Sequence, residues 1–168
     1  MKQGIRTVNE GILAASKERE ELSGMGTTFV CAVVDAGRLY VANIGDSRLY
    51  VLDRDTIRQI TLDHSLVEEL IRTGQLDPLK VRNHPEKNII TRALGANEEA
   101  IPDFFEIELH MDEKILMCSD GLSNMVEDDE IQNIIIEAEQ PEAAVIRLID
   151  RANYYGGKDN IAALVVAQ

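Results

Sequence analysis

The spacing of apolar residues along the chain predicts helices and a series of short strands. Residues 2–22 carry apolar side chains near helical spacing, and Ser23 and Gly24 end that helix. Apolar and β-branched runs joined by tight turns then predict strands, at residues 27–35, 38–44, 47–52 and 56–61. Consecutive strands of this kind are typical of an antiparallel meander.

The second half of the chain returns to regular elements after a polar, irregular stretch. Asp63 or Ser65 is expected to cap a helix that ends at Gly74. Further elements are expected as strands at residues 103–109, 113–119 and 161–166 and as helices at 126–138 and 141–155, the last with Ile146, Leu148 and Ile149 facing inward. Helices before and after antiparallel strands predict an α+β layered fold. With no linker or repeat, residues 1–168 are expected to form a single domain.

Charge and cysteine content narrow the classes of function. The 168 residues include 30 acidic and 17 basic side chains, a formal net charge of −13, which disfavours nucleic-acid and anionic-membrane partners. There is no apolar run of about 18 residues that would predict a membrane span. Cys31 and Cys118 lie in separate apolar runs, so they predict buried free thiols and a cytoplasmic protein.

Three aspartates are candidate metal ligands because of where they lie. Asp46 sits in a turn between two predicted strands, Asp120 follows an apolar strand, and Asp159 precedes another. Carboxylates that converge from strand ends suit hard cations such as Mg²⁺ or Mn²⁺. Aspartate is also a common turn residue. Position alone therefore leaves both interpretations open for each of the three.

Other polar residues are expected to have structural roles. The histidines are not at metal-ligand spacing, and His64 is interpreted as a residue at a helix start. Arg48 and Arg92 could contact phosphate, but surface or structural pairing is the favoured interpretation. Ser47 and Ser119 lack a paired histidine motif, which disfavours a serine nucleophile.

Six segments in order resemble the type 2C (PPM) metal-dependent protein serine/threonine phosphatase family, of bacterial type. They are Gly-Met-Gly-Thr-Thr at residues 24–28, Ala-Asn-Ile-Gly-Asp-Ser-Arg at 42–48, Leu-Asp-His-Ser-Leu at 62–66, Asn-Ile-Ile-Thr-Arg-Ala-Leu-Gly at 88–95, Ile-Leu-Met-Cys-Ser-Asp-Gly-Leu at 115–122 and Gly-Gly-Lys-Asp-Asn-Ile at 156–161. The resemblance extends over residues 4–168. It implies an antiparallel β-sandwich flanked by helices in α-β-β-α layers.

The resemblance also implies a chemistry and a set of roles. Two Mn²⁺ or Mg²⁺ ions would activate a bridging water that attacks phosphoserine or phosphothreonine on protein substrates, the targets of a serine/threonine kinase. Asp120 and Asp159 would be the catalytic residues and would bind one metal of the pair. Asp46 would join Asp120 at a third metal, and residues 64–96 would form a flap beside the active site.

The sequence departs from the family pattern at its start. The family's opening segment supplies an Arg that binds the phosphate, a Glu-Asp pair, and an Asp-Gly-x-Gly-Gly stretch whose Asp bridges both metals. The residues before Gly24 provide none of these elements. We therefore expect an N-terminally incomplete domain, its C-terminal two-thirds, that is inactive alone. The alternative is a non-catalytic phosphatase-like binding or regulatory module. A third possibility is a related phosphatase that has the same fold and acts on regulatory proteins in a signalling switch. Ala162 also stands where the family commonly has Thr.

Overall fold

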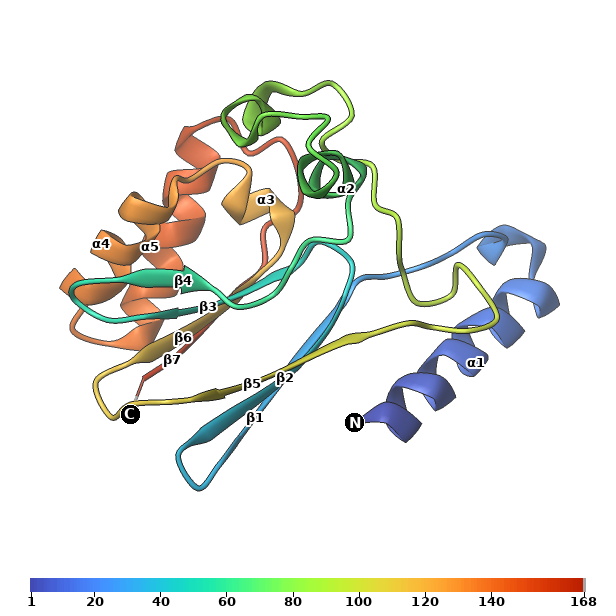
Figure 1. The fold of residues 1–168 in the computed structure, drawn as a ribbon, viewed down its shortest axis with the longest axis horizontal. Helices are drawn as coiled ribbons and strands as arrows, with labels where there is room; N and C mark the ends of the chain where they lie inside the picture. The colour runs from blue at the N-terminus through green and yellow to red at the C-terminus, as the bar shows by residue number, and fades with distance from the viewer. Residues whose placement is uncertain (168) are drawn as a thin grey trace. The chain divides into compact units, whose positions relative to one another are not determined.

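A computed structural model describes residues 1–167, leaving aside the side chains of Arg82 and Asn83. Its helices and 3-10 helices are α1 (Lys2–Glu18), η1 (Glu20–Leu22), α2 (Leu66–Arg72), η2 (Pro78–Asn83), α3 (Asp120–Ser123), α4 (Asp128–Glu137) and α5 (Pro141–Tyr154). Its strands are β1 (Phe29–Asp35), β2 (Arg38–Ile44), β3 (Arg48–Leu52), β4 (Ile57–Gln59), β5 (Asp103–Glu108), β6 (Lys114–Cys118) and β7 (Ala163–Val166) (Figure 1).

The strands form two sheets, in the orders β1-β2-β5 and β4-β3-β6-β7. The expected four-strand meander is therefore wrong, because β2 and β3 belong to different sheets. The turns explain the difference. Ala36 and Gly37 both have positive φ, at 48° and 78°, as a tight hairpin turn between β1 and β2 requires. Between β2 and β3 the backbone has positive φ only at Gly45, and there the chain passes to the other sheet.

The described residues gather into two compact units. The first comprises Met1–Ala32, Val41–Asp46 and Leu62–Phe104, and the second comprises Val33–Tyr40, Ser47–Thr61 and the chain from Phe105 onward. The prediction of an α+β fold with antiparallel sheets is confirmed by these elements and by the β3–β4, β3–β6 and β6–β7 pairings.

The second unit has its core between the four-stranded sheet and the helices α4 and α5. Contacts join α5 to β7, α4 to α5 and α4 to β4, and Figure 1 shows the two helices side by side against this sheet. The buried residues of α5 are Ala144, Leu148 and Ala152, spaced four apart as one helical stripe requires. Leu148 thus faces inward as predicted, whereas Ile146 is 61% exposed. Side chains two positions apart on a helix point in directions that differ by about 200°. Ile146 and Leu148 therefore cannot share a face.

The first unit packs α1 against segments that are distant in the sequence. Ile5 of α1 is buried with Ala42, Ile44 and Leu94. Asn9 on the same helix is also buried, and its amide is satisfied by backbone groups. Its Oδ1 accepts from the Gly95 N–H at 2.8 Å and its Nδ2 donates to the Asn97 carbonyl at 3.0 Å. Such satisfied polar contacts fix the helix as specifically as the apolar ones.

The polar stretch after residue 62 contains short helices with defined caps. Ser65 caps α2, since its Oγ accepts from the Glu68 N–H at 3.3 Å, and Gly74 follows the helix with φ 72°. Asp77 caps η2 by accepting from the Leu79 N–H at 3.0 Å. The helix expected here, with Asp63 or Ser65 as its cap and Gly74 as its end, is confirmed, and the cap is Ser65.

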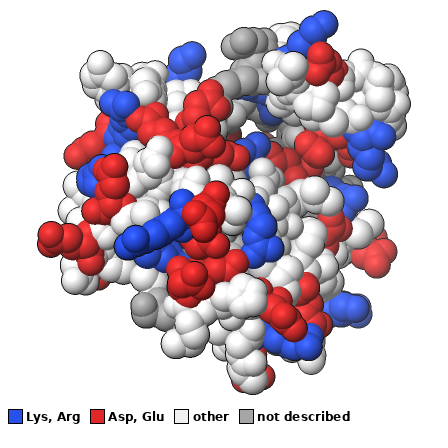
Figure 2. All heavy atoms as spheres, turned by 60° about the vertical axis from the view of Figure 1, so that its left-hand side comes forward, with Lys and Arg blue, Asp and Glu red and all other residues white. Residues whose placement is uncertain are grey.

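Acidic side chains outnumber basic ones in this chain, by 30 to 17, and both kinds lie on the surface (Figure 2). On the face drawn in Figure 2, acidic and basic side chains lie interspersed. Several are paired, as Arg147 is with Glu137 at 2.9 Å. Exposed pairs of this kind contribute only about 0–1 kcal/mol each. The core therefore dominates the stability of the second unit.

We expect Leu148→Ala to lower the free energy of unfolding by about 2–5 kcal/mol, because it leaves a cavity in a fully buried site. The matched control on the same helix is Ile146→Ala, which should change it by less than about 0.5 kcal/mol. Urea denaturation followed by circular dichroism measures both. Equal losses for the two variants would contradict the assigned buried face of α5.

Candidate functional site

The first part of the site is built where β6 ends. β6 pairs antiparallel with β3 and β7, and the pair Cys118–Ala163 is the last on the β7 side. Ser119 follows as the N-cap residue of the one-turn helix α3, whose first residue is Asp120. Asp120 is half-buried, and its Oδ2 accepts from Asn124 Nδ2 at 3.1 Å. The carboxylate is thus held at the strand end, as predicted.

The segment with Asp159 lies beside this strand end because Ser119 ties it there. The Ser119 N–H donates to the Ala162 carbonyl at 3.0 Å, and Ser119 Oγ accepts from the Ala162 N–H at 3.0 Å. The same hydroxyl donates to the Asn160 carbonyl at 3.1 Å. The Asp159 carboxylate in turn accepts from the Asn160 N–H at 2.7 Å. The hydroxyl of Ser119 therefore has a structural role, consistent with the prediction that it is no nucleophile.

Gly121 permits the close approach of the two segments. A Cβ at this position would lie 2.2 Å from the Asn160 carbonyl oxygen and 2.9 Å from its carbon, far inside van der Waals contact. The glycine is required here by crowding and not by an unusual φ, since its backbone is that of the helix α3. The start of α3 thus packs directly on the backbone that carries Asp159.

Electrostatics link the two aspartates. Burial, and then the negative charge of Asp159, raise the pKa of the Asp120 carboxyl above its ordinary value. The Gly121 N–H, Asn124 and the positive charge of Arg48 act in the opposite direction without cancelling the rise. Two carboxylates that repel one another at the end of two strands favour a cation between them. Among the residues described, no cluster of three or more His, Cys, Asp or Glu side chains could hold a metal.

Asp46 belongs to the first unit, whereas Asp120 and Asp159 belong to the second. It follows Gly45, whose φ is 104° and where a Cβ would lie 2.4 Å from Thr28 Cγ2. Asp46 is half-buried in the turn that closes β2. The structure thus brings Asp120 and Asp159 together, while the joining of Asp46 to Asp120 stays a prediction.

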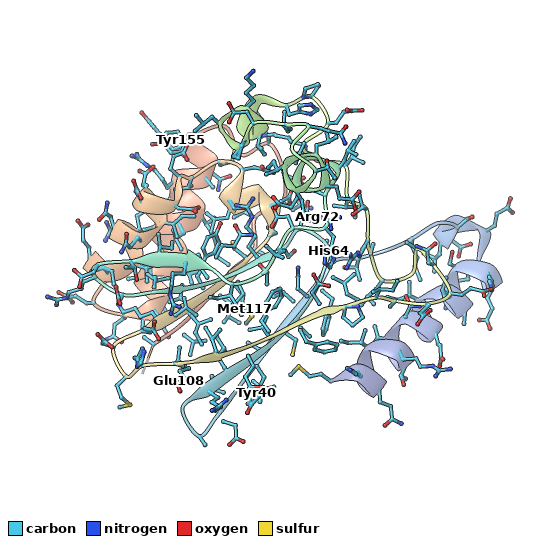
Figure 3. All side chains as sticks on the ribbon, viewed as in Figure 1. Tyr40, His64, Arg72, Glu108, Met117 and Tyr155 are labelled. Atoms are coloured by element: carbon cyan, nitrogen blue, oxygen red, sulfur yellow. The ribbon has the colours of Figure 1, made fainter. Side chains whose placement is uncertain are left out.

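A partly buried network beside Gly45 is not predicted by the sequence. His64 is 5% exposed; its Nδ1 accepts from the Gly45 N–H at 3.1 Å, and its Nε2 lies 3.1 Å from Asp103 Oδ2. Arg92 Nη1 donates to Asp103 Oδ1 at 3.1 Å. His64 does precede α2 as expected (labelled in Figure 3), but Ser65 is the cap. The structural pairing expected for Arg92 is confirmed, whereas nothing in the sequence singles out Asp103.

Opposing effects set the ionisation of Asp103. Burial disfavours its charged form, but the hydrogen bonds from His64 and Arg92 and the positive charge of Arg92 prevail and lower the pKa of the carboxyl below its ordinary value. Asp103 therefore keeps a charge that its neighbours already compensate.

The remaining candidates have structural partners. Arg48 Nη1 donates to the Tyr50 hydroxyl at 2.9 Å, and that hydroxyl donates to Asp128 Oδ1 at 3.2 Å. Burial raises the pKa of Tyr50 far above its ordinary value. Neither Cys31 nor Cys118 is part of a disulfide, and of the two only Cys118 is buried. Within residues 1–167, none of the helices combines the length and apolar character needed to cross a membrane.

Comparison with known proteins agrees with this geometry. Residues 2–161 match the family model described as protein phosphatase 2C. The serine/threonine phosphatase stp of Listeria welshimeri is 41% identical over 166 residues, which cover 99% of this chain and 66% of that protein. Protein phosphatase PhpP of Streptococcus pneumoniae is 41% identical over 149 residues, which cover 88% of this chain and 60% of PhpP.

Solved structures show the same fold. Serine/threonine phosphatase Stp1 from Staphylococcus aureus has a TM-score of 0.95 at 37% identity, covering 99% of this chain and 65% of that one. The catalytic domain of the phosphatase PstP, in complex with two manganese ions, has a TM-score of 0.85 at 33% identity, covering 95% and 66% of the two chains. This chain thus spans about two thirds of the length of these relatives. It belongs to the protein phosphatase 2C family.

Proposed function

We propose that this chain supplies part of a metal-dependent centre that hydrolyses phosphoserine and phosphothreonine on proteins. The observation that carries the proposal is the close placement of Asp120 and Asp159 by Ser119 and Gly121 in a member of this family. The repulsion between the two carboxylates supports a role in holding a cation, because a positive charge between them would relieve it.

The residues fit a hard divalent ion, Mn²⁺ or Mg²⁺, because both prefer carboxylate oxygens. When bound, such an ion lowers the pKa of a coordinated water and neutralises charge on phosphoryl oxygens. Asp120 and Asp159 would hold the ion, and Asn124 would orient the Asp120 carboxylate through its hydrogen bond. A related catalytic domain in complex with two manganese ions supports the choice of metal. In our proposal Asp46 joins Asp120 at a third ion.

We propose in addition that the 168-residue chain alone has little or no phosphatase activity. An Asp-Gly-x-Gly-Gly stretch, whose Asp the family resemblance assigns to both metals, does not occur in these 168 residues. Two carboxylates are few for a pair of divalent ions, so the ion at Asp120 and Asp159 would be weakly held.

The proposal also covers the substrates of the centre and its location in the cell. The names of the relatives support phosphoproteins as substrates, which we assign as targets of a serine/threonine kinase in cytoplasmic signalling. Residues 64–96, with α2 and η2, would form the flap of a single phosphatase domain and would influence which substrate is accepted.

We expect Asp120→Asn to weaken Mn²⁺ binding to the chain by about tenfold or more, which is about 1.4 kcal/mol, because one of two charged ligands is lost. Isothermal titration calorimetry measures the affinity. The control is Asp112→Asn, which removes the same charge from an exposed turn and should leave the affinity unchanged. Equal effects of both variants would show that the ion binds through net charge alone.

We expect no Mn²⁺-dependent hydrolysis of p-nitrophenyl phosphate by the 168-residue chain above the rate in buffer. The reason is the small number of carboxylates that it contributes to the centre. A continuous absorbance assay measures the rate. Mn²⁺-dependent hydrolysis that Asp120→Asn abolishes would show that the chain is active by itself. Mn²⁺ binding without hydrolysis is also what the alternative, a non-catalytic binding module, requires.

We expect Gly121→Ala to lower the free energy of unfolding by about 1–3 kcal/mol and to weaken Mn²⁺ binding, because the new methyl group displaces the backbone of Asn160. Thermal unfolding and calorimetry measure the two effects. Gly11→Ala in α1 is the control, since a Cβ there meets nothing within 4 Å. An alanine in that helix should be neutral or stabilise by up to about 1 kcal/mol. Unchanged Mn²⁺ affinity in Gly121→Ala would separate the glycine from the site.

A further inference from the structure

The feature with no assigned role is the partly buried network of His64, Asp103 and Arg92 in the first unit. One of its contacts with the rest of the unit falls on Gly45, the residue immediately before the candidate ligand Asp46. His64 is almost fully buried, and Arg92 remains 40% exposed at the solvent end of the network. A polar network of this kind is costly to bury unless each member is satisfied.

The hydrogen bonds define the state of the His64 ring. Because the Gly45 N–H donates to Nδ1 at 3.1 Å, this nitrogen carries a lone pair and no proton. The ring is therefore neutral with its proton on Nε2, which donates to Asp103 Oδ2 at 3.1 Å. Arg92 Nη1 is 3.2 Å from Nε2, but it donates to the carboxylate, at Oδ1. Asp103 and Arg92 thus select the tautomer that can accept from Gly45.

His64 forms hydrogen bonds with both backbone polar groups of Gly45, its N–H and its carbonyl. Besides the bond to its ring, its own backbone N–H donates to the Gly45 carbonyl at 3.0 Å. Asn43 Nδ2 donates to the same carbonyl at 3.3 Å. The His64 carbonyl accepts from the Thr91 N–H at 2.8 Å, which anchors the residue from the other side. A turn whose φ is 104° at Gly45 is thus fixed by three bonds to buried groups.

We infer that His64 is a positioning residue that holds the Gly45–Asp46 turn so that the Asp46 carboxylate is preorganised for a divalent cation. The inference rests on the proposed function of Asp46 as a metal ligand. A carboxylate held in place before the ion arrives binds it with less loss of conformational entropy. Loss of a hydrogen bond that orients a metal ligand typically lowers metal affinity by about 10–100-fold.

Two variants, each with an amide that can replace one ring nitrogen, separate the contacts of His64. In His64→Asn the amide oxygen falls near the position of Nδ1 and can still accept from Gly45, while the contact with Asp103 is lost. In His64→Gln the amide nitrogen reaches towards the position of Nε2 and can still donate to Asp103, while the acceptor for Gly45 is lost. Asp103→Asn is a milder variant that should disturb the tautomer without removing the ring.

The metal-free readout is amide hydrogen exchange of Gly45, measured by ¹⁵N–¹H spectroscopy on the 168-residue chain. We expect exchange in His64→Gln to be at least about tenfold faster than in the unsubstituted chain. We expect exchange in His64→Asn to be unchanged. If His64→Gln fails to fold by circular dichroism, Asp103→Asn should show the same change to a smaller degree. Exchange that is equally slow in every folded variant would overturn the inference.

The metal readout is the broadening of amide signals by paramagnetic Mn²⁺, followed separately at Asp46 and at Gly121. We expect His64→Gln and Asp46→Asn each to require about tenfold more Mn²⁺ for broadening near residue 46. The double variant should need no more than Asp46→Asn alone, because His64 acts through Asp46. Broadening at Gly121 should persist in all of them.

The outcomes separate this inference from the proposed function. Additive losses in the double variant, or a full response at residue 46 in His64→Gln, would overturn the positioning role while leaving Asp120 and Asp159 as ligands. Broadening at Gly121 without any at Asp46 in the unsubstituted chain would overturn it as well. Absence of broadening at Gly121 would contradict the proposed function itself. Amide exchange of Gly45 still reports on His64 in that event.

Discussion

The close approach of two backbone segments at the ends of β6 and β7 is the constraint on which the candidate metal centre depends. The Ser119 hydroxyl bonds to both Asn160 and Ala162, and Gly121 leaves room for the Asn160 carbonyl. The register of the sheet sets where this contact falls, since Cys118 pairs with Ala163. A slip of one residue would turn every side chain of the strand to the opposite face. The position of Asp120 relative to Asp159 is thus fixed by the whole four-stranded sheet and the core beneath it.

Much of this arrangement could be predicted from the sequence. Aspartates that directly follow or precede an apolar strand indicated where the carboxylates gather, and the Asp120 and Asp159 segments are neighbours as that pattern suggested. Local patterns also predicted a cap at Asp63 or Ser65, of which Ser65 is the one observed, because capping depends only on residues within one turn. Six segments in family order then predicted the fold, which the likeness to Stp1 confirms.

The remainder depends on contacts between residues far apart in the chain. His64 and Asp103 are 39 residues apart, and no local pattern pairs them. The role of Ser119 likewise depends on a partner 41 residues away. The expected meander divides into two sheets at Gly45, which has a positive φ, whereas the sequence shows only a turn there. Ile146 was misassigned because apolar character alone does not tell which side of a helix a residue occupies.

Two aspartates with opposite environments show why cation chemistry is expected at one place and not at the other. Asp103 is held by Arg92 and His64, so its pKa is lowered and its charge is already balanced within the protein. Asp120 is half-buried and faces Asp159, so its pKa is raised and its charged form is disfavoured. The first carboxylate stabilises a network, whereas the charged form of the second is disfavoured by its surroundings. Three hydrogen bonds and a glycine nevertheless hold the two segments together, and a repelling pair kept in place in this way is what the proposed role in holding a cation would require.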